Sequence, residues 1–463
     1  MNKLLIFASL LLLTATLSAQ TRPAKGKSPQ PAIQDVGKQN GKTRGNPIAD
    51  GIGLTDPHIF IHDGRAYLFA THDFAPDNSN YLMKDWWVWT SGDLLHWKLA
   101  SYVKPEDTFL GKPFNDCWAT FGVFRNNQWY FYFSAGQNEI GVVTAPTVEG
   151  PWTDPLGKPL IAKGLTPTQQ RDPDVLLDDD GEAYMVYGTF NYFIVRLNPD
   201  MISLAEQPRP IIIDRRFGPY GEGKTDDKPS LHKRNGKYYL SWCGFYAMAD
   251  NVYGPYAYRG AIFDPDKIAP ELKTEEYAFD RHGNIFTFNN QWYYAFNDFS
   301  SPGRSHHFRD ACITYLHYLD NGDIAPAVLD TIGVGQYDAQ QKVEAENYFK
   351  AVSATQNECP DGFAVSVSDG SILAYPNVRN MPENAAVTFR YASLNRNGAA
   401  IEVYDRYPDG ELLGTCQAPE TKSRNIFCTA SCQLKNRAGM NSIVLVFRGK
   451  GAEILRLDSF SFN

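Results

Sequence analysis

The chain has 463 residues, a formal net charge of −8 at pH 7, an aromatic content of 14%, 37 glycines and 29 prolines. This length accommodates two domains with their own cores, and a composition rich in aromatic and turn residues favours β structure. The net negative charge argues against a nucleic-acid partner, because neutralising phosphates requires clustered Lys and Arg, whereas a neutral polysaccharide makes no such demand.

The N-terminus predicts an exported protein. Lys3 precedes the apolar run from Leu4 to Leu13, and Leu17-Ser18-Ala19 supplies small residues for cleavage before Gln20. We therefore predict a signal peptide at residues 1–19 and a periplasmic or extracellular location. The apolar run is too short to cross a bilayer, and we expect no transmembrane segment elsewhere. Residues 20–45 are rich in Pro, Lys, Gly and Gln, which predicts a flexible linker.

Residues 46–335 contain five copies of one hairpin, each with a short strand, a turn rich in Asp, Asn or Gly, and an aromatic residue on the returning strand. The aligned aromatics are spaced by 63, 54, 55 and 54 residues, at Tyr67, Tyr130, Tyr184, Tyr239 and Tyr293. An even period of this size is typical of a radial β repeat. The sequence therefore predicts an all-β, five-bladed β-propeller here, in preference to a sandwich with similar hairpins.

Acidic residues recur at the starts of these repeats. Asp56 and Asp172 stand directly before proline, and Asp227 precedes Lys228-Pro229. A single Asp-Pro is most simply a turn residue, but three in near register would meet at the hub of a propeller. Carboxylates around one axis suit glycoside hydrolysis, in which one activates water, one protonates the leaving oxygen and one orients its neighbour.

Several motifs resemble glycoside hydrolase family 43. They are Thr55-Asp56-Pro57, Ser91-Gly92-Asp93-Leu94 with Trp97, Trp118-Ala119, and Arg171-Asp172-Pro173 followed by Asp178-Asp179-Asp180-Gly181. The resemblance implies a five-bladed propeller and inverting hydrolysis of arabinose- and xylose-containing glycans, with no cofactor required for the chemistry. It further implies that Asp56 is the general base and that Asp172 orients the acid and adjusts its pKa.

The same resemblance leaves the general acid open. The acid of the family is a Glu at the head of blade four, and the register places Asp227 there, one methylene shorter. Glu222 is the alternative acid, and loss of the acid would leave a propeller that only binds sugar. The resemblance implies substrate contacts for Trp118, His282 and Arg309, although His282 also fits a core histidine. Cys243 lies in an apolar strand-like context, where a free Cys is usually a small buried hydrophobe.

Residues 342–463 lack the hairpin repeat and contain short segments of alternating apolar and polar residues, which predict a β-sandwich, jelly-roll-like domain. The segments Val343-Glu344-Ala345-Glu346 and Leu457-Asp458-Ser459-Phe460 resemble carbohydrate-binding module family 6. The resemblance implies a structural calcium site at Glu344, Glu346 and Asp458, since hard carboxylate oxygens suit that ion. The sugar-stacking tryptophan of such modules is missing from residues 421–427.

Together these features predict an exported, inverting glycoside hydrolase that removes terminal α-L-arabinofuranosyl units from plant-type polysaccharide or oligosaccharide. Two alternatives of the same fold are a β-xylosidase and a β-D-galactofuranosidase. A third alternative, from another class, is a non-catalytic sugar-binding propeller.

Overall fold

The computed structural model describes residues 45–273, 279–299, 305–435 and 439–463. Within these ranges the regular structure is β-strand, apart from three 3₁₀ helices at Pro105–Asp107, Pro270–Leu272 and Ala345–Asn347. The all-β prediction is confirmed. The predicted signal peptide and nearly all of the predicted linker lie outside the described residues.

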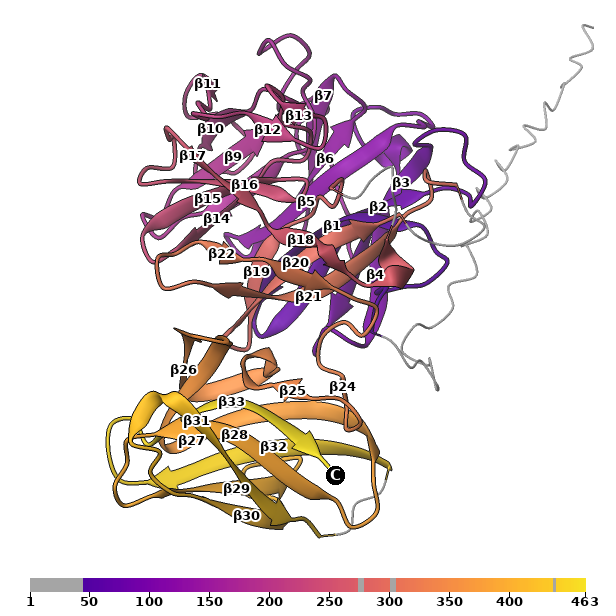
Figure 1. Ribbon diagram of the computed structural model, residues 1–463. Coiled ribbons are helices and arrows are strands. Elements are labelled where there is room, and N and C mark those ends of the chain that lie inside the picture. Colours follow the sequence, from indigo (N-terminus) through magenta and orange to yellow (C-terminus); the bar gives the residue numbers. More distant parts are fainter. Residues whose placement is uncertain (1–44, 274–278, 300–304, 436–438) are drawn as a thin grey trace, which may run out of the picture. The chain divides into compact units, whose positions relative to one another are not determined.

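Five antiparallel sheets follow one another along the chain and form the five blades of a propeller (Figure 1). The first strands of the blades, β1, β5, β8, β14 and β19, each contact the first strands of the two neighbouring blades, so they surround the hub. The blades are β1 (Leu54–His62), β2 (Arg65–Asp73), β3 (Met83–Ser91) and β4 (Trp97–Val103); β5 (Cys117–Arg125), β6 (Gln128–Ala135) and β7 (Glu139–Ala145); β8 (Asp174–Leu177), β9 (Ala183–Tyr187), β10 (Phe193–Leu197) and β11 (Arg209–Pro210); β14 (Ser230–Arg234), β15 (Lys237–Trp242), β16 (Phe245–Ala249) and β17 (Ala257–Ala261); and β19 (Ile285–Phe288), β20 (Gln291–Asp298), β21 (Asp310–Tyr318) and β22 (Ile324–Ala325).

The predicted repeat is the first hairpin of each blade. In blade four, for example, Asn235 and Gly236 form the turn with φ of 50° and 75°, as a tight two-residue hairpin requires. The aligned tyrosines all lie on the second strand and pair with the first, as Phe60 with Tyr67, Val123 with Tyr130, Leu176 with Tyr184, His232 with Tyr239, and Phe286 with Tyr293. The five-bladed prediction is confirmed.

Buried hydrophobic clusters join neighbouring blades all the way round the ring. The cluster that closes the ring includes Trp89 from blade one and Tyr293 from blade five. Asn46 adds a polar closure, because its Nδ2 donates to the carbonyl oxygens of Ile313 and Asp330, both at 2.9 Å. Because every blade packs on two others, the starts of the first strands are held in fixed positions around the hub.

Two pairs of short strands stand outside the blades. The hairpin of β12 (Phe217–Gly218) and β13 (Gly221–Glu222) precedes blade four. The second pair is parallel and joins β18 (Phe263–Ile268) to β23 (Ala327–Leu329).

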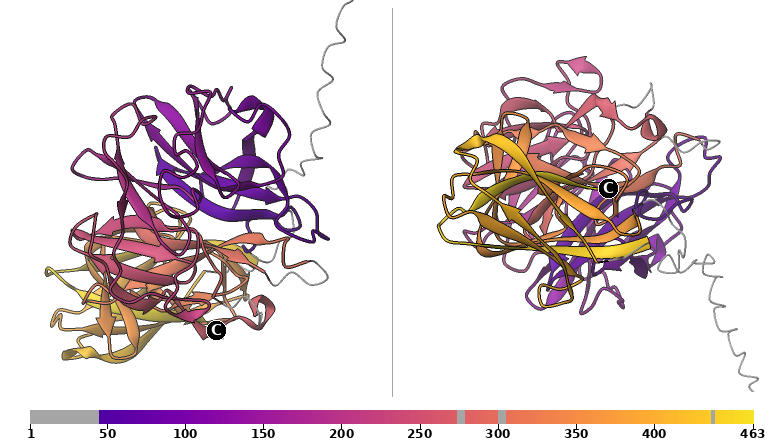
Figure 2. Two further views of the ribbon diagram at one scale, coloured as in Figure 1. Left: turned by 90° about the horizontal axis from the view of Figure 1, so that it is seen from above. Right: turned by 60° about the horizontal axis from the view of Figure 1, so that its bottom comes forward.

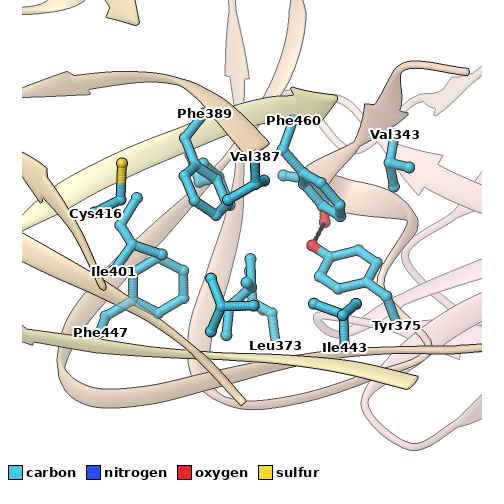
Figure 3. Close-up of a cluster of buried hydrophobic side chains, with 14 of the residues drawn as sticks. Val343, Leu373, Tyr375, Val387, Phe389, Ile401, Cys416, Ile443, Phe447 and Phe460 are labelled. Atoms are coloured by element: carbon cyan, nitrogen blue, oxygen red, sulfur yellow. Dashed lines mark hydrogen bonds between the residues drawn. The ribbon is translucent and has the colours of Figure 1, made fainter. Parts of the chain in front are cut away.

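The C-terminal strands form a β-sandwich around one hydrophobic core, as predicted (Figure 2). Figure 3 shows part of this core, in which Tyr375 donates its hydroxyl to the carbonyl oxygen of Ala345 at 2.8 Å. β24 lies in the segment between the two predicted domains and pairs with β27. The strands are β24 (Tyr337–Asp338), β25 (Val343–Glu344), β26 (Lys350–Cys359), β27 (Gly362–Met381), β28 (Ala386–Ser393), β29 (Ala399–Asp405), β30 (Leu412–Ala418), β31 (Ser423–Gln433), β32 (Gly439–Gly449) and β33 (Leu455–Phe462).

Candidate active site

Three equivalent residues at the hub adopt a left-handed backbone conformation directly before proline. They are Asp56, Asp172 and Lys228, with φ of 50°, 60° and 56°. Such a conformation costs a non-glycine residue about 1–3 kcal/mol and persists only where the surroundings impose it. The shared geometry shows that Lys228 occupies the third equivalent position, and that Asp227 stands one residue before it.

Side chains of the preceding blade accept hydrogen bonds from the backbone N–H groups of these strained residues. The N–H of Asp56 donates to Asn297 Oδ1 at 2.8 Å, and the N–H of Asp172 donates to Ser134 Oγ at 2.8 Å. The N–H of Lys228 donates to Asp172 Oδ2 at 3.1 Å. The left-handed turns are therefore braced between blades, and they fix the direction of the side chains at the hub.

These side chains line a cavity of about 410 Å³, within the size range of ligand pockets. The cavity brings together six predicted site residues, namely Asp56, Trp118, Asp172, Asp227, His282 and Arg309. Glu222 is not among its lining residues. The side chain of Glu222 on β13 is 72% exposed, and its Oε1 lies 3.4 Å from Arg215 Nε.

Asp56 is held as an anion by a set of donors. Its Oδ1 accepts hydrogen bonds from Arg309 Nη1 and Asn297 Nδ2, both at 2.9 Å, and from His282 Nε2. Its Oδ2 accepts from Thr71 Oγ1 at 3.0 Å and from Arg309 Nη2 at 3.3 Å. Burial acts to raise the pKa of Asp56, but Arg309 and His282 outweigh burial and hold the pKa well below 3.8. Asp56 is therefore ionised and firmly oriented.

Arg309 lies between two carboxylates. Its Nη1 and Nη2 donate to Asp56, while its Nε and Nη2 each donate to Asp73 at 3.0 Å. Burial raises the pKa of Asp73 although Arg309 opposes that rise. The bonds of this guanidinium orient Asp56, and the substrate contact expected for Arg309 stays a prediction.

Arg171 organises the opposite group of side chains. Its Nη2 lies 3.1 Å from Asp227 Oδ2, its Nε lies 3.6 Å from Asp172 Oδ2, and its guanidinium carbon lies 5.1 Å from the centre of the Trp118 ring. Burial raises the pKa of Asp172, Arg171 acts to lower it, and Asp227 adds to the rise. Arg171 thus ties two predicted catalytic carboxylates to an aromatic wall of the cavity.

Asp226 is a cavity residue that the sequence analysis missed. It is 6% exposed, and its Oδ2 accepts a hydrogen bond from the Cys243 thiol at 3.2 Å. Burial, followed by the charges of Asp227 and Asp280, raises the pKa of Asp226 to about 8. The register drew attention to Asp227 alone, although the Asp226-Asp227 pair was a visible signal.

His282 lies in a further cluster with Asp227, Cys243 and Asp280, whose potential ligand atoms lie within 4.8 Å of one another. His282 Nδ1 is 3.0 Å from Asp280 Oδ1 and 3.5 Å from Asp227 Oδ1. Burial lowers the pKa of His282, but Asp56 and Asp280 outweigh burial and raise it well above 6.5. His282 is therefore held as an imidazolium between Asp56 and Asp280.

The predicted calcium ligands converge in the sandwich. Glu344, Glu346 and Asp458 line one hollow, and the buried Oε2 of Glu346 has no hydrogen-bond partner among the residues that the structure describes. Burial, and then Glu344 and Asp458, raise the pKa of Glu346 to about 8. Lys342 Nζ lies 2.5 Å from Glu344 Oε1, and Arg390 Nη1 lies 2.5 Å from Asp458 Oδ1. The unpartnered oxygen among carboxylates fits a hard cation, which would tie β25 to β33.

We expect Ca²⁺ to stabilise the sandwich through this hollow. At a hundred times its dissociation constant, a ligand of the folded state adds about 2.7 kcal/mol to the free energy of unfolding. Thermal unfolding with and without Ca²⁺ measures the effect, which Glu346→Gln should abolish. Glu402→Gln is the control, because Glu402 lies on β29 and pairs with Arg448 at 2.9 Å. Equal melting temperatures of the wild type in Ca²⁺ and in chelator would refute the site.

A five-bladed propeller with a carboxylate-lined cavity at its hub defines a class, the propeller glycoside hydrolases. This chain belongs to glycosyl hydrolases family 43, whose family model matches residues 44–324. Residues 344–463 match the carbohydrate binding module (family 6). The predicted family resemblances and the prediction of a glycoside hydrolase are thereby confirmed. Hydrolysis by carboxylates of this kind needs no cofactor.

Relatives resemble the chain over most of its length. An arabinoxylan arabinofuranohydrolase of Paenibacillus polymyxa is 27% identical over 90% of this chain and 74% of its own length. One of Bacillus subtilis (strain 168) is 26% identical over 90% of this chain and 92% of its own. A crystal structure of a Bacillus subtilis family 43 arabinoxylan arabinofuranohydrolase in complex with cellotetraose covers 91% of this chain and 98% of its own, with a TM-score of 0.53 and 23% identity. That structure supports the fold.

Among the described residues, none of the helices has the length and apolar character needed to cross a membrane.

Proposed function

We propose that this protein is an exported, inverting glycoside hydrolase that removes terminal α-L-arabinofuranosyl units from plant-type polysaccharide or oligosaccharide. Two relatives that match 90% of the chain carry the name arabinoxylan arabinofuranohydrolase. The observation that carries the proposal is a single cavity lined by the ionised Asp56 and by the carboxylates beside Arg171.

In this mechanism Asp56 orients the attacking water and accepts its proton, and Asp172 orients the general acid and adjusts its pKa. We favour Oδ2 of Asp56 as the accepting atom, because it receives fewer and longer hydrogen bonds than Oδ1. A carboxylate with so low a pKa is a weak base, which suffices where the transition state resembles an oxocarbenium ion. A carboxylic acid at the head of blade four protonates the leaving oxygen.

Aryl glycosides test the sugar. We expect release of 4-nitrophenol from the α-L-arabinofuranoside in preference to the β-D-xyloside and the β-D-galactofuranoside, and release of arabinose from arabinoxylan. Preference for either other glycoside would replace the assignment with that sugar. Binding of soluble glycans without turnover of any substrate would favour the non-catalytic alternative. Proton NMR of the first product should show the β anomer, since inversion of an α-glycoside produces it.

Export is a separate part of the proposal and rests on the apolar run from Leu4 to Leu13. We expect the mature protein in the periplasm or the medium of a bacterial host with Gln20 as its first residue, measured by N-terminal sequencing. Recovery of the chain in the cytosol with Met1 intact would contradict it.

A further inference from the structure

We propose that Asp226, rather than its neighbour Asp227, donates the proton to the leaving glycosidic oxygen. The inference rests on the hydrolysis of a glycoside by this cavity and not on which sugar is removed. It departs from the register, in which Asp227 takes the place of the acid. Both side chains line the cavity, so the choice between them depends on their partners.

Asp227 is paired with cations. Its Oδ2 lies 3.1 Å from Arg171 Nη2, and its Oδ1 lies 3.5 Å from Nδ1 of the His282 imidazolium. Both carboxylate oxygens of Asp227 therefore face cationic groups of the protein.

Asp226 has the opposite surroundings. Among the described residues, Asp226 forms no ion pair with a Lys, Arg or His side chain. The one side chain that donates a hydrogen bond to its carboxyl group there is the neutral Cys243 thiol. Its backbone is fixed, because its carbonyl oxygen accepts from the Tyr192 hydroxyl at 2.7 Å and from the Phe190 N–H at 3.0 Å. A buried carboxyl beside like charges keeps its proton, and a fixed backbone aims it.

The charged and titratable groups around Asp226 come from several elements. Asp227 and Asp280 disfavour its ionisation, whereas the more distant His282 and the Cys243 thiol favour it. The charge of Arg171 and the hydroxyls of Tyr192 and Tyr220 also face it. The balance raises the pKa of Asp226 to about 8. The donor is therefore protonated below about pH 8, and its activity is lost as the pH rises through that value.

The step balances within the cavity. The carboxyl proton of Asp226 moves to the glycosidic oxygen as the bond from that oxygen to the anomeric carbon breaks, and the electron pair stays on the oxygen. Water attacks the anomeric carbon from the other face, and its proton passes to Asp56. The products are the free sugar and an alcohol, and exchange with solvent returns the proton from Asp56 to Asp226.

Leaving-group dependence tests the donor, because a good leaving group needs no proton. For Asp226→Asn we expect kcat/KM to fall about 10²- to 10⁴-fold on the 4-methoxyphenyl glycoside, the range for loss of general acid catalysis, and only a few-fold on the 2,4-dinitrophenyl glycoside. The alkaline limb of its pH profile should disappear. Asp227→Asn should lose activity equally on both substrates and should keep the alkaline limb. The limb should move to lower pH, because the charge of Asp227 no longer raises the pKa of Asp226. Reversed behaviour of the two variants would overturn the proposal.

Cys243→Ala gives a second measurement, through a residue outside the chemistry. Removing the thiol hydrogen bond raises the pKa of Asp226, so the alkaline limb should move to higher pH. A limb that stays in place would count against Asp226 as the donor. All variants are compared on the glycoside that the wild type cleaves. Failure of the sugar assignment therefore appears in the wild type, and failure of the donor assignment appears only in the variants.

Discussion

Asp56→Asn is expected to lower kcat/KM about 10²- to 10⁴-fold, since the amide cannot accept the proton of the attacking water. The change also leaves Arg309 and His282 beside an uncharged group in a buried site. Breaking a buried ion pair by removing one partner costs about 3–5 kcal/mol, so the free energy of unfolding should fall by that order. Steady-state kinetics and denaturant unfolding measure the two effects separately.

Asp298→Asn is the matched control for this variant. Asp298 Oδ1 accepts from Arg281 Nη1 at 2.8 Å, and both side chains are buried, but neither lines the cavity. The control should lose stability on the same scale and keep kcat/KM within a few-fold well below its melting temperature. If the control loses as much activity as Asp56→Asn, the loss at Asp56 reflects folding and not chemistry.

The propeller was predictable because its repeat depends on residues that are close together in the sequence. Each first hairpin has turn residues that tolerate positive φ and an aromatic residue three positions after the turn, and these recur in the sequence at an even period. Asp56 and Asp172 were predictable for the same reason, since each stands directly before proline at an equivalent point. Ring closure by Asn46 was not predictable, because its partners Ile313 and Asp330 are far away in the chain.

In blade four the sequence did not indicate which partners each carboxylate has. Counting from the hairpin places Asp227 near the hub, but the count cannot show that Arg171 pairs with Asp227 while Asp226 receives only a thiol. Glu222 is only five residues from Asp227 in the sequence, yet β12 and β13 hold it in solvent beside Arg215. The state of each carboxylate depends on partners from other blades, and no local pattern encodes them.

Lys228 is the least expected of these partners. It occupies the position of an aspartate in the two other repeats, and its side chain is directed into the hub and is buried. Its Nζ lies 2.9 Å from both His58 Nδ1 and the carbonyl oxygen of Thr120. On its other side, His58 Nε2 lies 2.8 Å from Asp174 Oδ2. Burial and the charge of Lys228 lower the pKa of His58, so the imidazole is neutral and accepts from the ammonium. Burial lowers the pKa of Lys228, and the neighbouring carboxylates oppose that fall. Lys228 is therefore a further cation of the acidic hub, beside Arg171 and Arg309.

Lys228→Met is expected to lower the free energy of unfolding by about 1–3 kcal/mol, because methionine has a similar length but leaves the buried His58 Nδ1 and the Thr120 carbonyl oxygen without this donor. Lys228 lowers the pKa of both Asp56 and Asp172, so its loss raises both values. The acid limb of the pH profile of kcat/KM should then move to higher pH. Lys237→Met is the control in the same hairpin, since Lys237 is 51% exposed and pairs with Asp250 at the surface, where a pair contributes about 0–1 kcal/mol. A Lys228→Met variant with wild-type stability and an unmoved acid limb would mean that neither property depends on the charge of Lys228.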